Sequence, residues 1–249
     1  ATMNMAQTKI IERWRNHNRK IRDQFDQPVP KAFLRWNNSK GESGATVWLY
    51  DVIGKDLWGD GISASEVAEQ LQGIGEVDQL NVRINSPGGF VTEATAIFNM
   101  IDQFDAVKVF DIDGIAASAA SWLPMAGDHI RMAFNATLMV HDPWSMVMGD
   151  AAELRSEADI LDGFRDRILD TFARRNQLDR EDVAELMSDE SWLSASQALD
   201  HGFVDEVTGL NADDEATNRT KHPDDKNGEA SANLWRSAQS LLKLAEIST

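Results

Sequence analysis

Strand-like and helix-like patterns alternate along the first half of the chain. Strands are expected where apolar residues run together or alternate with polar ones, and helices where apolar residues recur every three or four positions. Strand-like patterns cover residues 45–52, 82–84 and 107–110, and helix-like patterns cover residues 63–71 and 90–104. Ser63 and Glu66 predict a capping box at the start of the first helix, and we expect Gly73 and Gly75 to end it. This alternation indicates right-handed crossover units, and therefore an α/β fold with a mainly parallel sheet.

The segment Asp113–Trp122, with the sequence DGIAASAASW, follows the third predicted strand. We expect the strand to end at Gly114 and a helix to begin near Ser118, with small residues in the sharp turn between them. The first amides of a helix lack intrahelical partners and stabilise nearby negative charge, so a nucleophile and an anion hole could share this turn. On this segment alone, the simpler interpretation is that Ser118 caps the helix.

Four motifs follow one another at compatible spacings: Asn85–Gly89 (NSPGG), Gly114–Ser118 (GIAAS), Asn135–His141 (NATLMVH), and Trp192–Ala195 (WLSA) with Gly202–Asp205 (GFVD). Together they resemble the ClpP serine peptidases, and most closely the phage ClpP-related head maturation (prohead) proteases. The resemblance covers about Ala45 to Val207. It implies the ClpP/crotonase-like fold of repeated β-β-α units with a protruding handle helix, and residues 150–176 carry the longest helical pattern of the chain.

The resemblance also implies the active-site residues. Ser118 would be the nucleophile, His141 the general base and Glu190 the third member of the triad, with Asp189 as the alternative. Family members such as ClpP itself carry aspartate at the third position. The amides of Gly89 and Ala119 would form the oxyanion hole, and the edge formed by Gly88, Gly89 and Phe90 would pair with an extended substrate backbone.

The histidine assignment has a second basis in the residues themselves. The chain has five histidines, and only His141 ends a predicted buried strand beside a polar turn. It lies 23 residues after Ser118, close to the family spacing, with an apparent two-residue shortening around Asp128–Arg131. The remaining histidines are expected in solvated segments or turns: His17, His129, His201 and His222.

Composition excludes several functions. A formal charge of −17 and a pI near 4.6 leave no basic surface for a nucleic acid. The absence of cysteine excludes disulfides, thiolate nucleophiles and cysteine-bound zinc, and we expect neither a metal nor an organic cofactor. We see no membrane-spanning stretch and no secretory signal, so we expect a cytoplasmic protein, in a host cell or inside an immature phage head.

We expect three parts: a partly helical N-terminal arm (residues 1–30), a protease domain (31–208), and an acidic flexible tail (209–249) with a short terminal helix. The arm could be an assembly contact, a removable pro-segment or a remnant of recombinant expression. Within the domain, further strands are expected at 31–36, 130–133 and 137–140, and further helices at 179–187 and 195–199.

The expected function is that of an ATP-independent serine endopeptidase, a phage head maturation protease that processes capsid or scaffold proteins and its own ends. The family implies self-association into rings, commonly stacked heptamers, but the arm and tail do not predict an ATP-driven unfoldase as partner. Three alternatives stay open: a catalytically weak capsid-assembly or scaffold component, a crotonase-like acyl-CoA enzyme, and a serine–lysine dyad.

Overall fold

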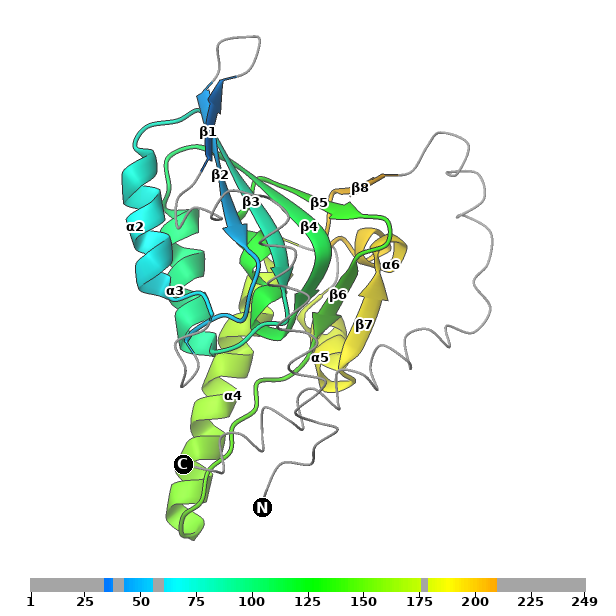
Figure 1. The fold of residues 1–249 in the computed structure, drawn as a ribbon. Coiled ribbons are helices and arrows are strands. Elements are labelled where there is room, and N and C mark those ends of the chain that lie inside the picture. Colours follow the sequence, from blue (N-terminus) through cyan, green and yellow to red (C-terminus); the bar gives the residue numbers. More distant parts are fainter. Residues whose placement is uncertain (1–33, 38–42, 56–60, 176–178, 210–249) are drawn as a thin grey trace, which may run out of the picture. The chain divides into compact units, whose positions relative to one another are not determined.

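A mostly parallel sheet lies at the centre of the computed structural model, which describes residues 34–37, 43–55, 61–175 and 179–209 (Figure 1). The strand order is β1-β2-β3-β4-β5-β8, and β6 pairs with the end of β4 and with β7. Only the β1–β2 and β6–β7 pairs are antiparallel among the described strands. The strands are β1 (Leu34–Asn37), β2 (Ser43–Leu49), β3 (Gln79–Ser86), β4 (Val107–Ala117), β5 (His129–Ala133), β6 (Thr137–Val140), β7 (Ser191–Ser194) and β8 (Glu206–Thr208).

Five α-helices accompany these strands within the described residues: α2 (Ala64–Ile74), α3 (Val91–Asp102), α4 (Ala151–Ala173), α5 (Arg180–Ser188) and α6 (Ala195–Asp200). Each of α2 and α3 connects two parallel strands, as the alternating pattern predicts. The long helix α4 corresponds to the expected handle, and its buried residues, Ile168, Leu169 and Phe172, all lie near its C-terminal end. Its N-terminal half extends away from the sheet (Figure 1).

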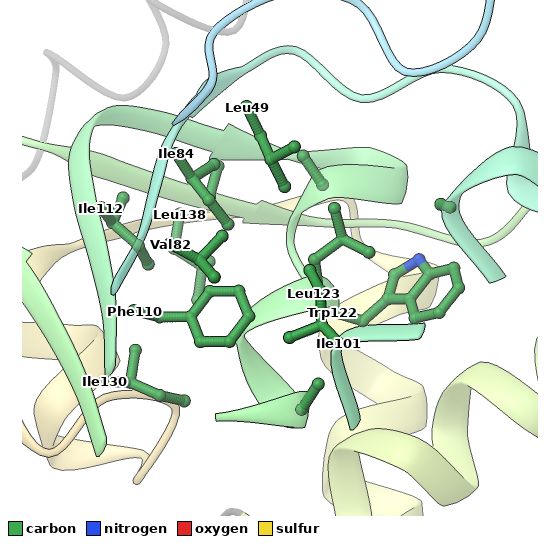
Figure 2. Packing of buried hydrophobic residues seen from close by; sticks show 14 of the residues in the cluster. Leu49, Val82, Ile84, Ile101, Phe110, Ile112, Trp122, Leu123, Ile130 and Leu138 are labelled. Atoms are coloured by element: carbon green, nitrogen blue, oxygen red, sulfur yellow. The ribbon is translucent and has the colours of Figure 1, made fainter. Parts of the chain in front are cut away.

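The hydrophobic core fills the space between one face of the sheet and the helices. Residues of β3 alternate strictly between buried and half-buried, so that Val82 and Ile84 point into the core. Figure 2 shows these side chains packed near Phe110 and Ile112 of β4. The α/β class and the mainly parallel sheet are therefore confirmed.

Helix ends follow the local sequence. Ser63 and Glu66 form the expected capping box at α2, and Asp179 caps α5 through the Asp182 amide. One expectation is wrong in detail: Gly73 lies inside α2, and the helix ends at Gly75, which has a φ of 66°. The predicted arm, residues 31–33 of the first predicted strand, and residues 210–249 of the tail with its terminal helix lie outside the described residues.

The prediction for the Ser118 turn needs two corrections. The strand does not end at Gly114, because β4 continues to Ala117 and pairs there with β6. No α-helix begins at Ser118 either. The chain forms two short 3₁₀ turns, Ser118–Ala120 (η1) and Leu123–Ala126 (η2), and Pro124 in η2 cannot donate the backbone hydrogen bond of a continuous helix. A helix macrodipole therefore contributes little at this turn.

The other face of the sheet carries a polar network. Arg83 on β3 forms a two-pronged ion pair with Asp113 on β4, and the hydroxyl of Tyr50 donates to the same carboxylate. Beside them, Arg131 on β5 pairs with Asp111 through two hydrogen bonds of 2.8 Å. Burial, the hydrogen bond to Asp113 and its charge together raise the pKa of Tyr50 from 10.0 to about 12.

This shift predicts an alkaline loss of stability. Tyr50 is the single tyrosine of the chain, and its pKa is raised in the folded state, so the unfolded chain ionises first. The free energy of unfolding should fall by about 1–2 kcal/mol between pH 10 and 12, after allowance for the exposed part of the ring. Phenolate absorbance should titrate near pH 12 in the native protein. A native midpoint at the unfolded value, or an equal alkaline loss in Tyr50→Phe, would contradict this.

Candidate active site

Ser118 lies at the point where β4 ends and η1 begins. Its φ is 52°, in the left-handed region that non-glycine residues seldom occupy. Such a conformation costs about 1–3 kcal/mol and persists only where the surroundings impose it. The amide and the hydroxyl of Ser121 both donate to the Ser118 carbonyl, at 2.9 and 2.6 Å. These two hydrogen bonds hold the Ser118 backbone in the turn.

His141 follows the last residue of β6. Since β6 runs parallel to the end of β4, with Ala117 opposite Met139, Ser118 and His141 leave the sheet at the same edge. The Ser118 Oγ lies 2.6 Å from the His141 Nε2. The structure thus joins the two residues in a nucleophile–base contact of the kind that activates a hydroxyl.

The other described histidines lie elsewhere. The Nε2 of His129 lies 3.2 Å from Glu206 at the β5–β8 pair, and His201 ends α6. His17 and His222 fall outside the described residues. Among the described histidines, His141 is therefore the one that contacts Ser118.

Strand β7 carries the expected third residue toward the same place. It pairs antiparallel with β6 as far as Val140 opposite Ser191, and His141 and Glu190 are the next residues beyond that pair. Glu190 is half-buried, has a φ of 51°, and its Oε1 lies 3.4 Å from the Trp192 indole nitrogen. Asp189 is exposed and ends α5. Glu190 is therefore the acidic residue next to the end of the β6–β7 pair, and Asp189 lies one residue further away; the sequence did not predict β7 as a strand.

The glycine-rich loop lies directly against the Ser118 turn. A Cβ added to Gly88 would lie 2.8 Å from the Ala119 amide nitrogen. Gly88 accepts a hydrogen bond from Ile53 at 2.8 Å, and Phe90 donates one back at 2.9 Å. In this parallel bridge the amide of Gly89 points away from Ile53. The loop therefore presents a backbone amide on its open side, and the Phe90 side chain remains 50% exposed.

Gly88→Ala should disturb this arrangement strongly. The new Cβ would approach the Ala117 carbonyl to 2.5 Å and the Ser118 Cβ to 2.7 Å, at a φ of +93°. Because small displacements of reacting groups cost about 10²-fold in rate, kcat should fall by at least that factor. Gly75→Ala is the matched control, with a φ of +66° and no atom within 4 Å of the added Cβ. Equal peptidase activity in the two variants would contradict the expectation.

A small hollow of about 20 Å³ opens beside Ser118 and His141. Its walls are mainly apolar, and the buried Trp122 indole nitrogen on one wall has no hydrogen-bond partner among the described residues. We did not anticipate the wall residues, because α4 and α3 contribute side chains whose helical spacing resembles that of any core residue. The hollow is lined by Val91, Ser118, Ala119, Ser121, Trp122, His141, Pro143, Ile168 and Phe172.

Two other features are absent from the described part of the chain. No group of three or more histidine, aspartate or glutamate side chains there could hold a metal ion. Nor is any helix in that part both long and apolar enough to cross a membrane.

Comparison with known proteins agrees with the geometry. The family model described as Clp protease matches residues 60–211. An ATP-dependent Clp protease proteolytic subunit from Illicium oligandrum is 35% identical over 203 residues, which is 75% of this chain and 97% of that protein. An ATP-dependent Clp protease proteolytic subunit 1 from Salinibacter ruber is 27% identical over 139 residues, which is 55% of this chain and 60% of that protein.

Proposed function

Because the chain belongs to the Clp protease family, and is thus a serine-type peptidase, we propose that Ser118, His141 and Glu190 form its catalytic triad. The observation that carries this proposal is the 2.6 Å contact between the Ser118 Oγ and the His141 Nε2. It satisfies the distance requirement for a general base and its nucleophile in the unliganded chain.

The reaction would be acyl transfer to Ser118. His141 accepts the hydroxyl proton as the oxygen attacks the peptide carbonyl, and then passes that proton to the leaving amine. A water molecule, activated by the same imidazole, hydrolyses the acyl-enzyme and restores the serine. Glu190 orients the ring and stabilises its cation. An apolar side chain of the substrate would lie against the mainly apolar walls of the hollow beside Ser118.

Backbone amides would stabilise the tetrahedral oxygen. The packing of Gly88 against the Ala119 amide supports a hole formed by the amides of Gly89 and Ala119. The same loop pairs with Ile53 on one side only, so its other side could add an extended substrate as a further strand, with contacts to Gly88, Gly89 and Phe90.

We further propose that the biological role is phage head maturation. The two relatives are named as subunits of ATP-dependent proteases, so the support for the narrower role is the motif resemblance in this sequence. The substrates would be capsid or scaffold proteins and the protein's own ends, and hydrolysis would proceed without ATP in a homo-oligomeric ring. Intact masses of wild type and Ser118→Ala after expression test the self-processing, since identical termini would contradict it. Particle imaging tests the ring.

An active-site probe tests the triad directly. A fluorophosphonate should form one adduct on wild type, and fragmentation mass spectrometry should place it on Ser118 rather than on Ser121, which lines the same hollow. Ser118→Ala should remain unlabelled, and Ser65→Ala, changed at an exposed helix position, should label like wild type. An unlabelled wild type would favour the scaffold alternative, and an adduct on another residue would exclude Ser118 as the nucleophile.

Two alternatives have less support. A serine–lysine dyad would need a lysine near Ser118, but the lysines within the described residues, Lys55 and Lys108, form ion pairs with Glu66 and Asp128. A crotonase-like acyl-CoA enzyme would not need the contact between Ser118 and His141.

A further inference from the structure

Asp142, the residue after His141, is fixed from two directions. Its carboxylate accepts a hydrogen bond of 2.7 Å from the Arg165 Nε on α4, and its amide donates to the Met187 carbonyl at 3.1 Å. The Asp142 and Arg165 side chains are 37% and 31% exposed, so solvent screens this ion pair only in part. The chain immediately after His141 is therefore attached both to α4 and to the end of α5.

The Met187 carbonyl joins two segments of the site. It accepts from the Asp142 amide and also from the Glu190 amide, the latter at 3.2 Å. One backbone oxygen thus binds the residue after His141 and the expected third residue of the triad. This oxygen belongs to α5. The segment after His141 is therefore linked to α4 by the contact between Asp142 and Arg165.

Helix α4 also contributes to the active-site hollow. Ile168 and Phe172 line it, and Arg165 precedes Ile168 by about one turn on the same helix. A shift of α4 would therefore move one wall of the hollow and, through Arg165, the segment that carries His141.

We propose that Arg165 is a positioning residue, which acts through Asp142 to hold the His141 imidazole against Ser118 and to couple that contact to α4. This inference rests on the proposed function. Neutralising Arg165 leaves the Asp142 carboxylate unpaired beside His141. The backbone after His141 is then free to move, and the nearby negative charge favours the imidazolium form of the ring.

Arg165→Gln should lower kcat for a fluorogenic peptide about 10- to 100-fold with little change in KM, because a displaced base slows the chemical step rather than binding. The acid limb of the pH profile of kcat/KM should move to higher pH, since the groups facing His141 would then include an unpaired Asp142 as well as Glu190. Asp142→Asn should lower kcat without that shift. The double variant should be no slower than the slower single variant, as expected for coupled residues.

Arg180→Gln is the matched control. Arg180 also joins α5 to α4 through ion pairs, to Asp166 and to Asp170, but these lie outside the hollow. Its loss should leave kcat and the pH profile near those of wild type. A kcat loss in Arg165→Gln no larger than that in Arg180→Gln would overturn the inference, as would an unshifted pH profile. Wild type that a fluorophosphonate does not label would overturn the proposed function itself, whereas equal labelling rates in wild type and Arg165→Gln would overturn only the role of Arg165.

Discussion

A Ser118→Ala variant is expected to hydrolyse peptides about 10⁴- to 10⁶-fold more slowly than wild type, the range found when a triad nucleophile is removed. The change removes the oxygen that lies 2.6 Å from the His141 Nε2 and leaves the β4–β6 pairing that carries both residues. The loss should appear in kcat, with peptide binding retained. Active-site-titrated kinetics against one fluorogenic peptide would measure it.

His141→Ala should cost a similar factor, and the double variant should be no slower than either single variant, because the two side chains act as a unit. Thermal unfolding controls for the fold. Alanine at position 118 also relieves no strain, since the φ of 52° is unfavourable for any residue with a Cβ. A Ser118→Ala protein that cleaves at the wild-type rate with an intact fold would exclude Ser118 as the nucleophile.

Glu190→Gln is expected to lower kcat about 10³- to 10⁴-fold. The amide is nearly isosteric with the carboxylate, but it cannot stabilise the imidazolium and can hold the ring in the wrong tautomer. The loss should be smaller than for Ser118→Ala because the serine, the histidine and the oxyanion amides remain. Peptide kinetics over a pH series would measure the change in kcat.

Asp189→Asn is the matched comparison, since it removes one negative charge from the neighbouring position. Asp189 is exposed at the end of α5, whereas Glu190 directly precedes β7, which pairs with β6. We therefore expect Asp189→Asn to retain activity within about twofold of wild type, as for a surface change. If Asp189→Asn were the inactive variant instead, the third member of the triad would be the preceding residue.

Features that depend on neighbouring residues could be predicted from the sequence. The cap at Ser63 and the bounds of β6 depend on hydrogen bonds and alternation within a few residues, and the structure has both as expected. The structure of the turn at Ser118 could not be predicted from its local sequence. Its small residues are compatible with either the start of a helix or an extended strand. The pairing of β4 with β6 stabilises the extended strand up to Ala117.

The site depended on contacts between distant segments. The resemblance pointed to Ser118, His141 and Glu190, but their separation in the chain says nothing about distance in space. Strand pairing sets the positions of these segments: β4 and β6 end at one edge, beside Ser118 and His141, and β7 returns along β6 from the residue after Glu190. The sequence did not indicate a role for Arg165, because an arginine on an amphipathic helix is usually a solvated residue.

By itself, the amino-acid sequence determined the α/β class, the alternating order of most elements, and the residue types able to perform acyl transfer. These follow from periodicity, capping and side-chain chemistry, which act over a few positions. Only the tertiary structure decided that the Ser118 hydroxyl meets the His141 ring, that Glu190 directly precedes the strand paired with β6, and that Asp142 is attached to α4. Such choices depend on strand register and helix packing, which bring together residues far apart in the chain.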